Sequence, residues 1–256
     1  SGVCGPVVTF PDRANGTGRI ACFPMTLLAI CLFVGTLLLS LAATARVKST
    51  YAKYHQLPAA SGETGAEVAA QILDRAGIHH VEIIEHDEML GDHYDPIRKR
   101  LVLSSQNYHG TSCAALGVAA HECGHAIQDK IAFAPLRWRM AAVGVTTYAN
   151  QVVLWLPFLG IFTGLIAPLT GAVIMACAWG VIMLFNLITL PVEFDASRRA
   201  KEILAGMGHV ATEEQMSAVR KVLDAAAWTY VAAFITSLAF MLWHLLPLLL
   251  GGRRED

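Results

Sequence analysis

The sequence His121-Glu122-Cys123-Gly124-His125 follows the pattern H-E-x-x-H. Small residues precede it and no proline interrupts residues 111–130, so we expect this stretch to form a helix. Residues four apart lie on one helix face, which lets His121 and His125 direct two ring nitrogens at one Zn²⁺ ion. Glu122 is turned by about 100° from His121 and borders the metal. It would act there as the general base that takes a proton from a zinc-activated water. The third ligand must come from elsewhere in the chain.

The composition is typical of a membrane protein. The 256 residues are 55% hydrophobic and only 15% charged, whereas soluble domains carry about 25% charged residues. The net charge is −1, and no RNA-binding or zinc-finger pattern is present, so we expect no nucleic-acid partner. We therefore predict a mainly α, multi-pass protein of the lipid bilayer with a small α+β soluble part.

Four apolar stretches are long enough to cross a bilayer, which takes about 20 residues each. We expect the first helix over 25–45, a transmembrane hairpin over 140–190, and a fourth helix over 225–250. Basic residues follow the first stretch and do not precede it, which favours a retained anchor over a cleaved signal peptide. A buried helical pair in a soluble core is the alternative to the hairpin.

The two ends of the chain differ from the rest. Residues 1–24 are rich in Gly, Pro and polar residues and have no periodicity. We interpret them as an atypical leader, outside the native chain if translation begins at Met25. Residues 251–256 are expected to form a short polar tail.

The region 46–139 predicts a small soluble α+β unit. Thr64-Gly65-Ala66-Glu67 is a capping box that begins a helix, and Gly77 ends it. Residues 81–85 and 100–104 predict strands, and 92–96 predict a turn. The strand over 100–104 could bind an extended peptide along its edge, or it could be an ordinary core strand.

The region 191–224 follows the hairpin and predicts a polar segment and an amphipathic helix. With four spans, it lies on the same side of the membrane as 46–139. Glu193 can then complete a His2Glu zinc site whose fourth position stays open, as catalytic zinc requires. Asp195 is the alternative ligand. We prefer Glu193 and expect Asp195 to orient a histidine through its other ring nitrogen. An ion pair of Glu193 with Arg198 or Arg199 is the structural alternative.

Basic residues near the spans gather on the face that these two regions share, while the hairpin turn has none. By the positive-inside rule this places the metal site on the cytosolic side. The basic residues are Arg46, Lys48, Lys53, Lys130, Arg137, Arg139, Arg198, Arg199, Lys201, Arg220 and Lys221.

Several segments together resemble one family. They are Lys48-Ser49-Thr50-Tyr51, Thr64–Glu67, Asp92-His93-Tyr94-Asp95-Pro96, Ala119–Gln128 and Leu190–Ser197. The chain resembles the YugP-like neutral zinc metallopeptidases of bacterial membranes. The resemblance implies a zinc-dependent peptidase of the H-E-x-x-H plus Glu (gluzincin) class in the bacterial inner membrane. The family is similar in plan to the HtpX and CAAX-prenyl peptidases, where an Asp follows the third-ligand Glu by four residues; here that position is Ser197.

The function we expect is a metalloendopeptidase that cleaves unfolded or membrane-proximal polypeptide at the cytosolic membrane face, with membrane protein quality control as one setting.

The tetrahedral oxyanion formed during peptide hydrolysis would need a further hydrogen-bond donor besides zinc. We prefer His93 or Tyr94 among the candidates His93, Tyr94, Tyr108, Arg198 and His209. The rival hypotheses are a zinc-stabilised scaffold or adaptor without proteolytic activity and a transporter. The absence of Asp, Glu, Lys and Arg from the predicted spans disfavours the transporter.

Overall fold

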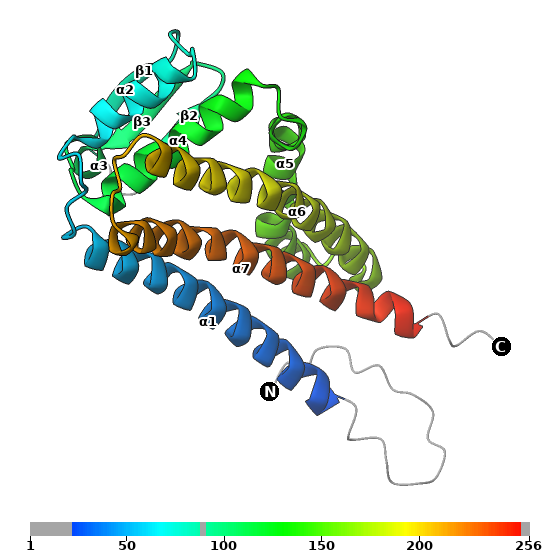
Figure 1. Cartoon of the computed structure of the whole chain (residues 1–256). Coiled ribbons are helices and arrows are strands. Elements are labelled where there is room, and N and C mark those ends of the chain that lie inside the picture. The colour runs from blue at the N-terminus through cyan, green and yellow to red at the C-terminus, as the bar shows by residue number, and fades with distance from the viewer. Residues whose placement is uncertain (1–21, 88–90, 252–256) are drawn as a thin grey trace, which may run out of the picture.

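The computed structural model describes residues 22–87 and 91–251, so most of the predicted leader and the tail after Gly251 lie outside the described residues. The elements follow one another in this order (Figure 1): α1 (Cys22–Tyr54), α2 (Gly65–Arg75), β1 (Glu82–His86), β2 (His93–Asp95), β3 (Arg100–Ser104), α3 (Ser105–Tyr108), α4 (Cys113–Lys130), α5 (Ala134–Thr163), α6 (Pro168–Gly206) and α7 (Glu213–Gly251). The predicted mainly α architecture with a small sheet is confirmed.

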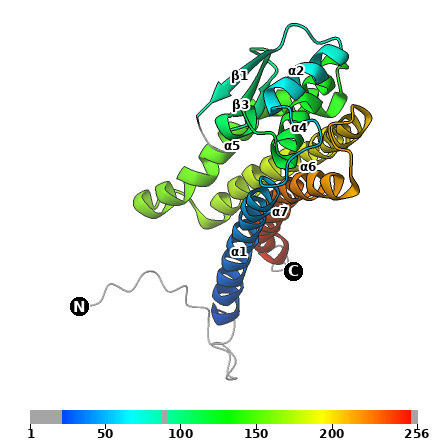
Figure 2. The same cartoon turned by 60° about the vertical axis from the view of Figure 1, so that its left-hand side comes forward.

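Four helices, α1, α5, α6 and α7, are long and apolar enough to cross a membrane. Their outward side chains match a lipid surrounding, since Leu38, Leu159 and Leu187 are about half exposed. Helices α6 and α7 run side by side, and α1 packs along α7 (Figure 1). The sheet, α2 and α4 form a head at one end of these helices, while the start of α1 and the end of α7 lie at the other end (Figure 2).

The long helices extend beyond the predicted spans. Helix α1 continues past residue 45 to Tyr54, and α5 begins at Ala134 rather than near residue 140. Helix α6 does not end near residue 190 but runs through Pro191 to Gly206. A proline in a helix removes one backbone N–H donor, a loss that packing on both sides of α6 can offset. Glu193 therefore lies within a helix that reaches from the membrane into the head.

The head contains a three-stranded sheet in the order β1-β3-β2, with β1 parallel and β2 antiparallel to β3. The segment 92–96, predicted as a turn, forms strand β2, because its backbone pairs with β3 from His93 to Asp95. Strand β3 is central, so neither of its edges is free, and of the two alternatives the structure shows the ordinary core strand.

The local helix signals of the head are confirmed. Thr64 accepts a hydrogen bond from the Glu67 backbone, and the Glu67 side chain accepts one from the Thr64 backbone. Gly77 follows α2 with a φ of +64°, the left-handed conformation that glycine adopts freely. Thr212 and Gln215 exchange the same pair of bonds at the start of α7. These caps satisfy backbone donors that helix starts leave free.

Helix α4 is the centre of the head. Its residues Leu116, Ala120 and Cys123 are fully buried in the core shared with α2, the sheet, and the ends of α6 and α7. At Gly124 the backbone of α6 comes so close that a β-carbon there would lie 2.9 Å from the carbonyl oxygen of Ala196. Only glycine permits this approach, which brings Glu193 of α6 next to the histidines of α4.

We expect Gly124→Ala to destabilise the protein by about 1–3 kcal/mol, because the methyl group would push α6 away from α4. Gly117→Ala on the same helix is the matched control, since a β-carbon there meets Val219 at an ordinary 3.5 Å. A helical glycine replaced by alanine normally gains about 0.5–1 kcal/mol, so the control should be neutral or stabilising. Thermal unfolding in detergent measures both, and equal midpoints for the two variants would contradict the proposed close approach.

Candidate metal centre

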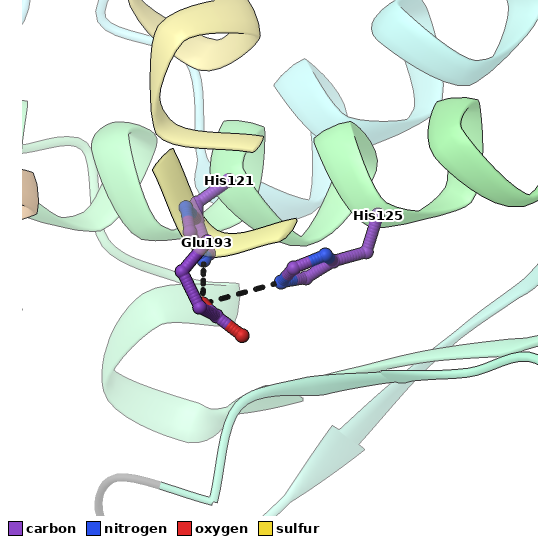
Figure 3. A group of neighbouring side chains, drawn as sticks. All are labelled: His121, His125 and Glu193. Atoms are coloured by element: carbon purple, nitrogen blue, oxygen red, sulfur yellow. Dashed lines mark hydrogen bonds and ion pairs between the residues drawn. The ribbon is translucent and has the colours of Figure 1, made fainter. Parts of the chain in front are cut away.

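Three side chains converge between α4 and α6 (Figure 3). His121 and His125 lie one turn apart on α4, and Glu193 reaches them from α6. The Glu193 Oε2 atom lies 3.2 Å from His121 Nε2 and 3.6 Å from His125 Nε2. Glu193 is 2% exposed, so its carboxylate is buried with the two rings. The structure thus brings together the three residues that the sequence analysis proposed as metal ligands.

The donor set fits Zn²⁺. The three ligand atoms lie within 4.8 Å of one another. Tetrahedral zinc with bonds of 2.0–2.1 Å requires ligand atoms about 3.3–3.4 Å apart, close to the two distances from Glu193. Two imidazoles and one carboxylate are also the ligand set of catalytic zinc sites, which leave one position for substrate or water. His121, His125 and Glu193 would hold the ion, and Asp195 is not part of this group.

Each histidine is oriented through its other nitrogen. Ser197 Oγ lies 3.1 Å from His121 Nδ1, and Gln128 Oε1 lies 3.0 Å from His125 Nδ1. The Gln128 amide nitrogen donates to the Val192 carbonyl at 2.8 Å, which fixes the amide orientation. Since the Gln128 oxygen only accepts, His125 Nδ1 carries the proton and its Nε2 lone pair is free for a metal.

Asp195 affects a histidine only indirectly, through Gln128, and not by the direct contact that the sequence predicted. It contacts neither histidine but accepts a hydrogen bond of 3.0 Å from Gln128, which in turn holds His125. Arg199 also donates to Asp195, so the carboxylate anchors Gln128 within an ion-paired network. Ser197, four residues after Glu193, takes the direct contact with His121.

The charges around the site favour a bound cation. Burial lowers the pKa of His125, but the nearby carboxylates of Glu193 and Glu122 outweigh it and raise that pKa above its ordinary value. A proton on His125 must leave before a metal binds, so metal affinity should increase with pH. Arg139 on α5 donates a hydrogen bond of 2.9 Å to Glu193 Oε1. The other carboxylate oxygen, Oε2, faces the two histidines.

Two cavities meet at the metal centre, with volumes of about 140 and 200 Å³. The first has apolar walls from α1, α4 and α7; the second is bounded by β2, α5, α6 and α7. Glu122 lines both cavities and is 7% exposed. The Glu122 carboxylate thus borders the same space as His121 and Glu193.

The candidate oxyanion donors from the sequence lie at different places. His93 lines the second cavity, with its Nδ1 atom 2.7 Å from the Gly91 carbonyl. Tyr94 lines the same cavity, but its hydroxyl donates to Asp129 at 2.7 Å. Burial and Asp129 raise the Tyr94 pKa well above its usual value, so the phenol stays protonated. Arg198 pairs with Asp195 and Glu202, and His209 pairs with Glu63. Tyr108 packs against the hydrophobic core.

Two residues that the sequence analysis did not single out face the metal centre. Arg139 was counted only as a flanking basic residue, although it holds Glu193. Tyr230 on α7 lines both cavities and interacts with the Glu193 carboxylate. The available signals were a polar aromatic residue in the apolar stretch 225–250 and an arginine directly before the predicted hairpin.

The fold and the site together define a class: a membrane protein of several long helices with a two-histidine, one-glutamate metal centre in its head. Residues 29–249 match the family described as "Putative neutral zinc metallopeptidase", and the chain belongs to this family. The chain is 40% identical over 230 residues to a protein of Bacillus subtilis (strain 168) named "Putative membrane protease YugP". The match covers 90% of this chain and 100% of that protein. No solved structure matches significantly. The resemblance inferred from the sequence segments is confirmed.

We expect Glu193→Ala to weaken zinc binding by at least about a hundredfold, because one of three ligands is lost. Glu202→Ala on the same helix is the control, since Glu202 is exposed and pairs with Arg198 rather than with a residue of the metal centre. Metal analysis of the purified variants measures zinc per chain. Full zinc occupancy in Glu193→Ala would contradict Glu193 as the third ligand and would point to Asp195 instead.

A smaller loss is expected for Ser197→Ala, which removes the hydrogen bond to His121 Nδ1 but no ligand. Such orienting contacts contribute about 10–100-fold in metal affinity. Ser237→Ala is the control, a buried serine on α7 that bonds to its own helix and to Asn186. Competition with a zinc chelator gives the affinities, and equal values for the two variants would show that Ser197 does not orient the ring.

Proposed function

We propose that this protein is a membrane-bound zinc metalloendopeptidase of the H-E-x-x-H plus Glu type. The observation that supports it most is the position of Glu122, which is buried and lines both cavities together with His121 and Glu193. A metal that only ties α4 to α6 needs no such acid. A carboxylate at this position therefore favours hydrolysis over the rival function, a zinc-stabilised scaffold.

Each residue of the centre has a role in peptide hydrolysis. Zinc, when bound, supplies a Lewis acid that lowers the pKa of water and polarises a carbonyl group. Glu122 takes a proton from the attacking water and passes it to the leaving amine. Ser197 and Gln128 keep the two imidazole rings in place. Arg139, Tyr230 and His93, which line the second cavity, are the candidate donors for the developing oxyanion.

The substrate is an unfolded or membrane-proximal polypeptide. The second cavity is lined by His93 of β2 in the head and by Met140, Val143 and Phe185 of the long helices. A polypeptide near the membrane surface can reach a cavity that joins these two parts. The basic residues that flank the spans favour the cytosolic side of the bacterial inner membrane. Quality control of membrane proteins is a setting consistent with such access.

Glu122→Gln tests the proposal. We expect zinc to stay bound, because Glu122 is not a ligand, while the turnover of unfolded casein falls about 10²–10⁴-fold, the usual contribution of a general base. Glu202→Gln, an exposed acid on α6, is the control and should keep full activity. Zinc content and cleavage are measured on the same preparations. Undiminished cleavage in Glu122→Gln, after chelator controls exclude a contaminant, would contradict the mechanism.

A further inference from the structure

A basic pocket lies between α1 and α7, away from the metal ligands. Its volume is about 400 Å³. It is lined by Arg46, Ser49, Thr50, Lys53, Tyr54, Lys221 and Asp224. Three cations and three hydroxyl-bearing side chains thus line one open space, and this set of polar groups is suited to an oxyanion.

The positive charges of this pocket are not neutralised by the protein. The Lys53 and Lys221 ammonium groups lie 5.3 and 5.7 Å from the centre of the Tyr54 ring, one from each helix. Within 22–87 and 91–251, neither lysine nor Arg46 has a carboxylate within ion-pair distance. The one acid of the pocket, Asp224, pairs with Lys201 of α6 at 3.3 Å. Like charges on α1 and α7 therefore face each other across the space.

The pocket lies where both helices leave the apolar region. Arg46 directly follows the apolar stretch 25–45 of α1, and Lys221 and Asp224 precede the apolar stretch 225–250 of α7. Trp228, half exposed one turn further along α7, is a residue type that gathers at membrane interfaces. The basic pocket is thus at the depth of lipid headgroups.

We propose that the basic pocket binds the phosphate of an anionic phospholipid headgroup. Arg46, Lys53 and Lys221 supply the charge, and the hydroxyl groups of Thr50 and Tyr54 supply neutral donors. Basic pockets between membrane helices are suited to headgroup phosphates, and each basic residue near an anionic surface contributes a factor of about five in affinity. Free inorganic phosphate has the same chemistry, but the depth of the pocket favours the lipid.

A bound phosphate would hold α1 against α7. The same turns of α1 place Val47 and Tyr51 in the wall of the first cavity of the metal centre, opposite Val222 of α7. Arg46, Thr50 and Lys53 of α1 line the basic pocket instead. A phosphate that neutralises cations of both helices therefore stabilises this wall. The lipid site does not require that the protein be a peptidase.

The test compares two double variants of the full-length protein in detergent. Lys53→Gln/Lys221→Gln removes two charges that line the pocket. Lys48→Gln/Arg220→Gln removes two charges from the same helices at positions that do not line it. Native mass spectrometry measures the dissociation constants of short-chain phosphatidylglycerol and phosphatidylcholine. We expect phosphatidylglycerol to bind the native protein at least about tenfold more tightly, and the pocket variant to lose about 25-fold, with the control within about twofold.

Two further arms make the result decisive. Lys53→Arg/Lys221→Arg keeps both charges and should retain phosphatidylglycerol binding, so its loss would contradict the proposal. Equal weakening in the pocket and control variants would show a general effect of charge and overturn it. The proposal also fails if phosphatidylcholine binds as tightly as phosphatidylglycerol. It fails as well if inorganic phosphate displaces the lipid at equal concentration, which would assign the pocket to free phosphate.

Discussion

The close contact between Gly124 of α4 and Ala196 of α6 is the constraint on which the site depends. Two helices that meet almost backbone to backbone leave their neighbouring side chains little freedom to move apart. His121 and His125 lie on either side of Gly124 in the sequence, and Glu193 lies one turn before Ala196. The distances between the three ligand atoms therefore follow from the helix packing. Gln128 and Ser197 orient the two imidazole rings through contacts to their Nδ1 atoms.

Much of the site could be predicted from the sequence because its signals are short-range or topological. The spacing of His121 and His125 follows from the helix period, and the apolar stretches require that Glu193 return to the same membrane side. The capping boxes and the strand over 100–104 were also readable locally. The prediction that Asp195 contacts a histidine directly was wrong, because Asp195 bonds to Gln128 and Gln128 bonds to His125. Nothing in the sequence shows that Gln128 lies between Asp195 and His125.

The features that were not predicted depend on packing between distant segments. Arg139 and Tyr230 reach Glu193 only because α5 and α7 flank α6, and neither residue is part of a local pattern. Strand β2 forms because residues 93–95 pair with the backbone of β3, although their sequence alone favours a turn. Helix α6 passes Pro191 because neighbouring helices stabilise it on both sides. In each case a tertiary contact outweighs a local preference.

The continuity of α6 has a mechanical consequence. One continuous helix carries both a stretch that is long and apolar enough to cross a membrane and Glu193, the proposed third metal ligand. A helix whose apolar length differs from the local hydrocarbon thickness responds by tilting. Tilting α6 about its contact with α4 would swing Glu193 relative to the two imidazoles. A change in bilayer thickness would then alter the distances between Glu193 and the two histidines without any lipid contact to these residues.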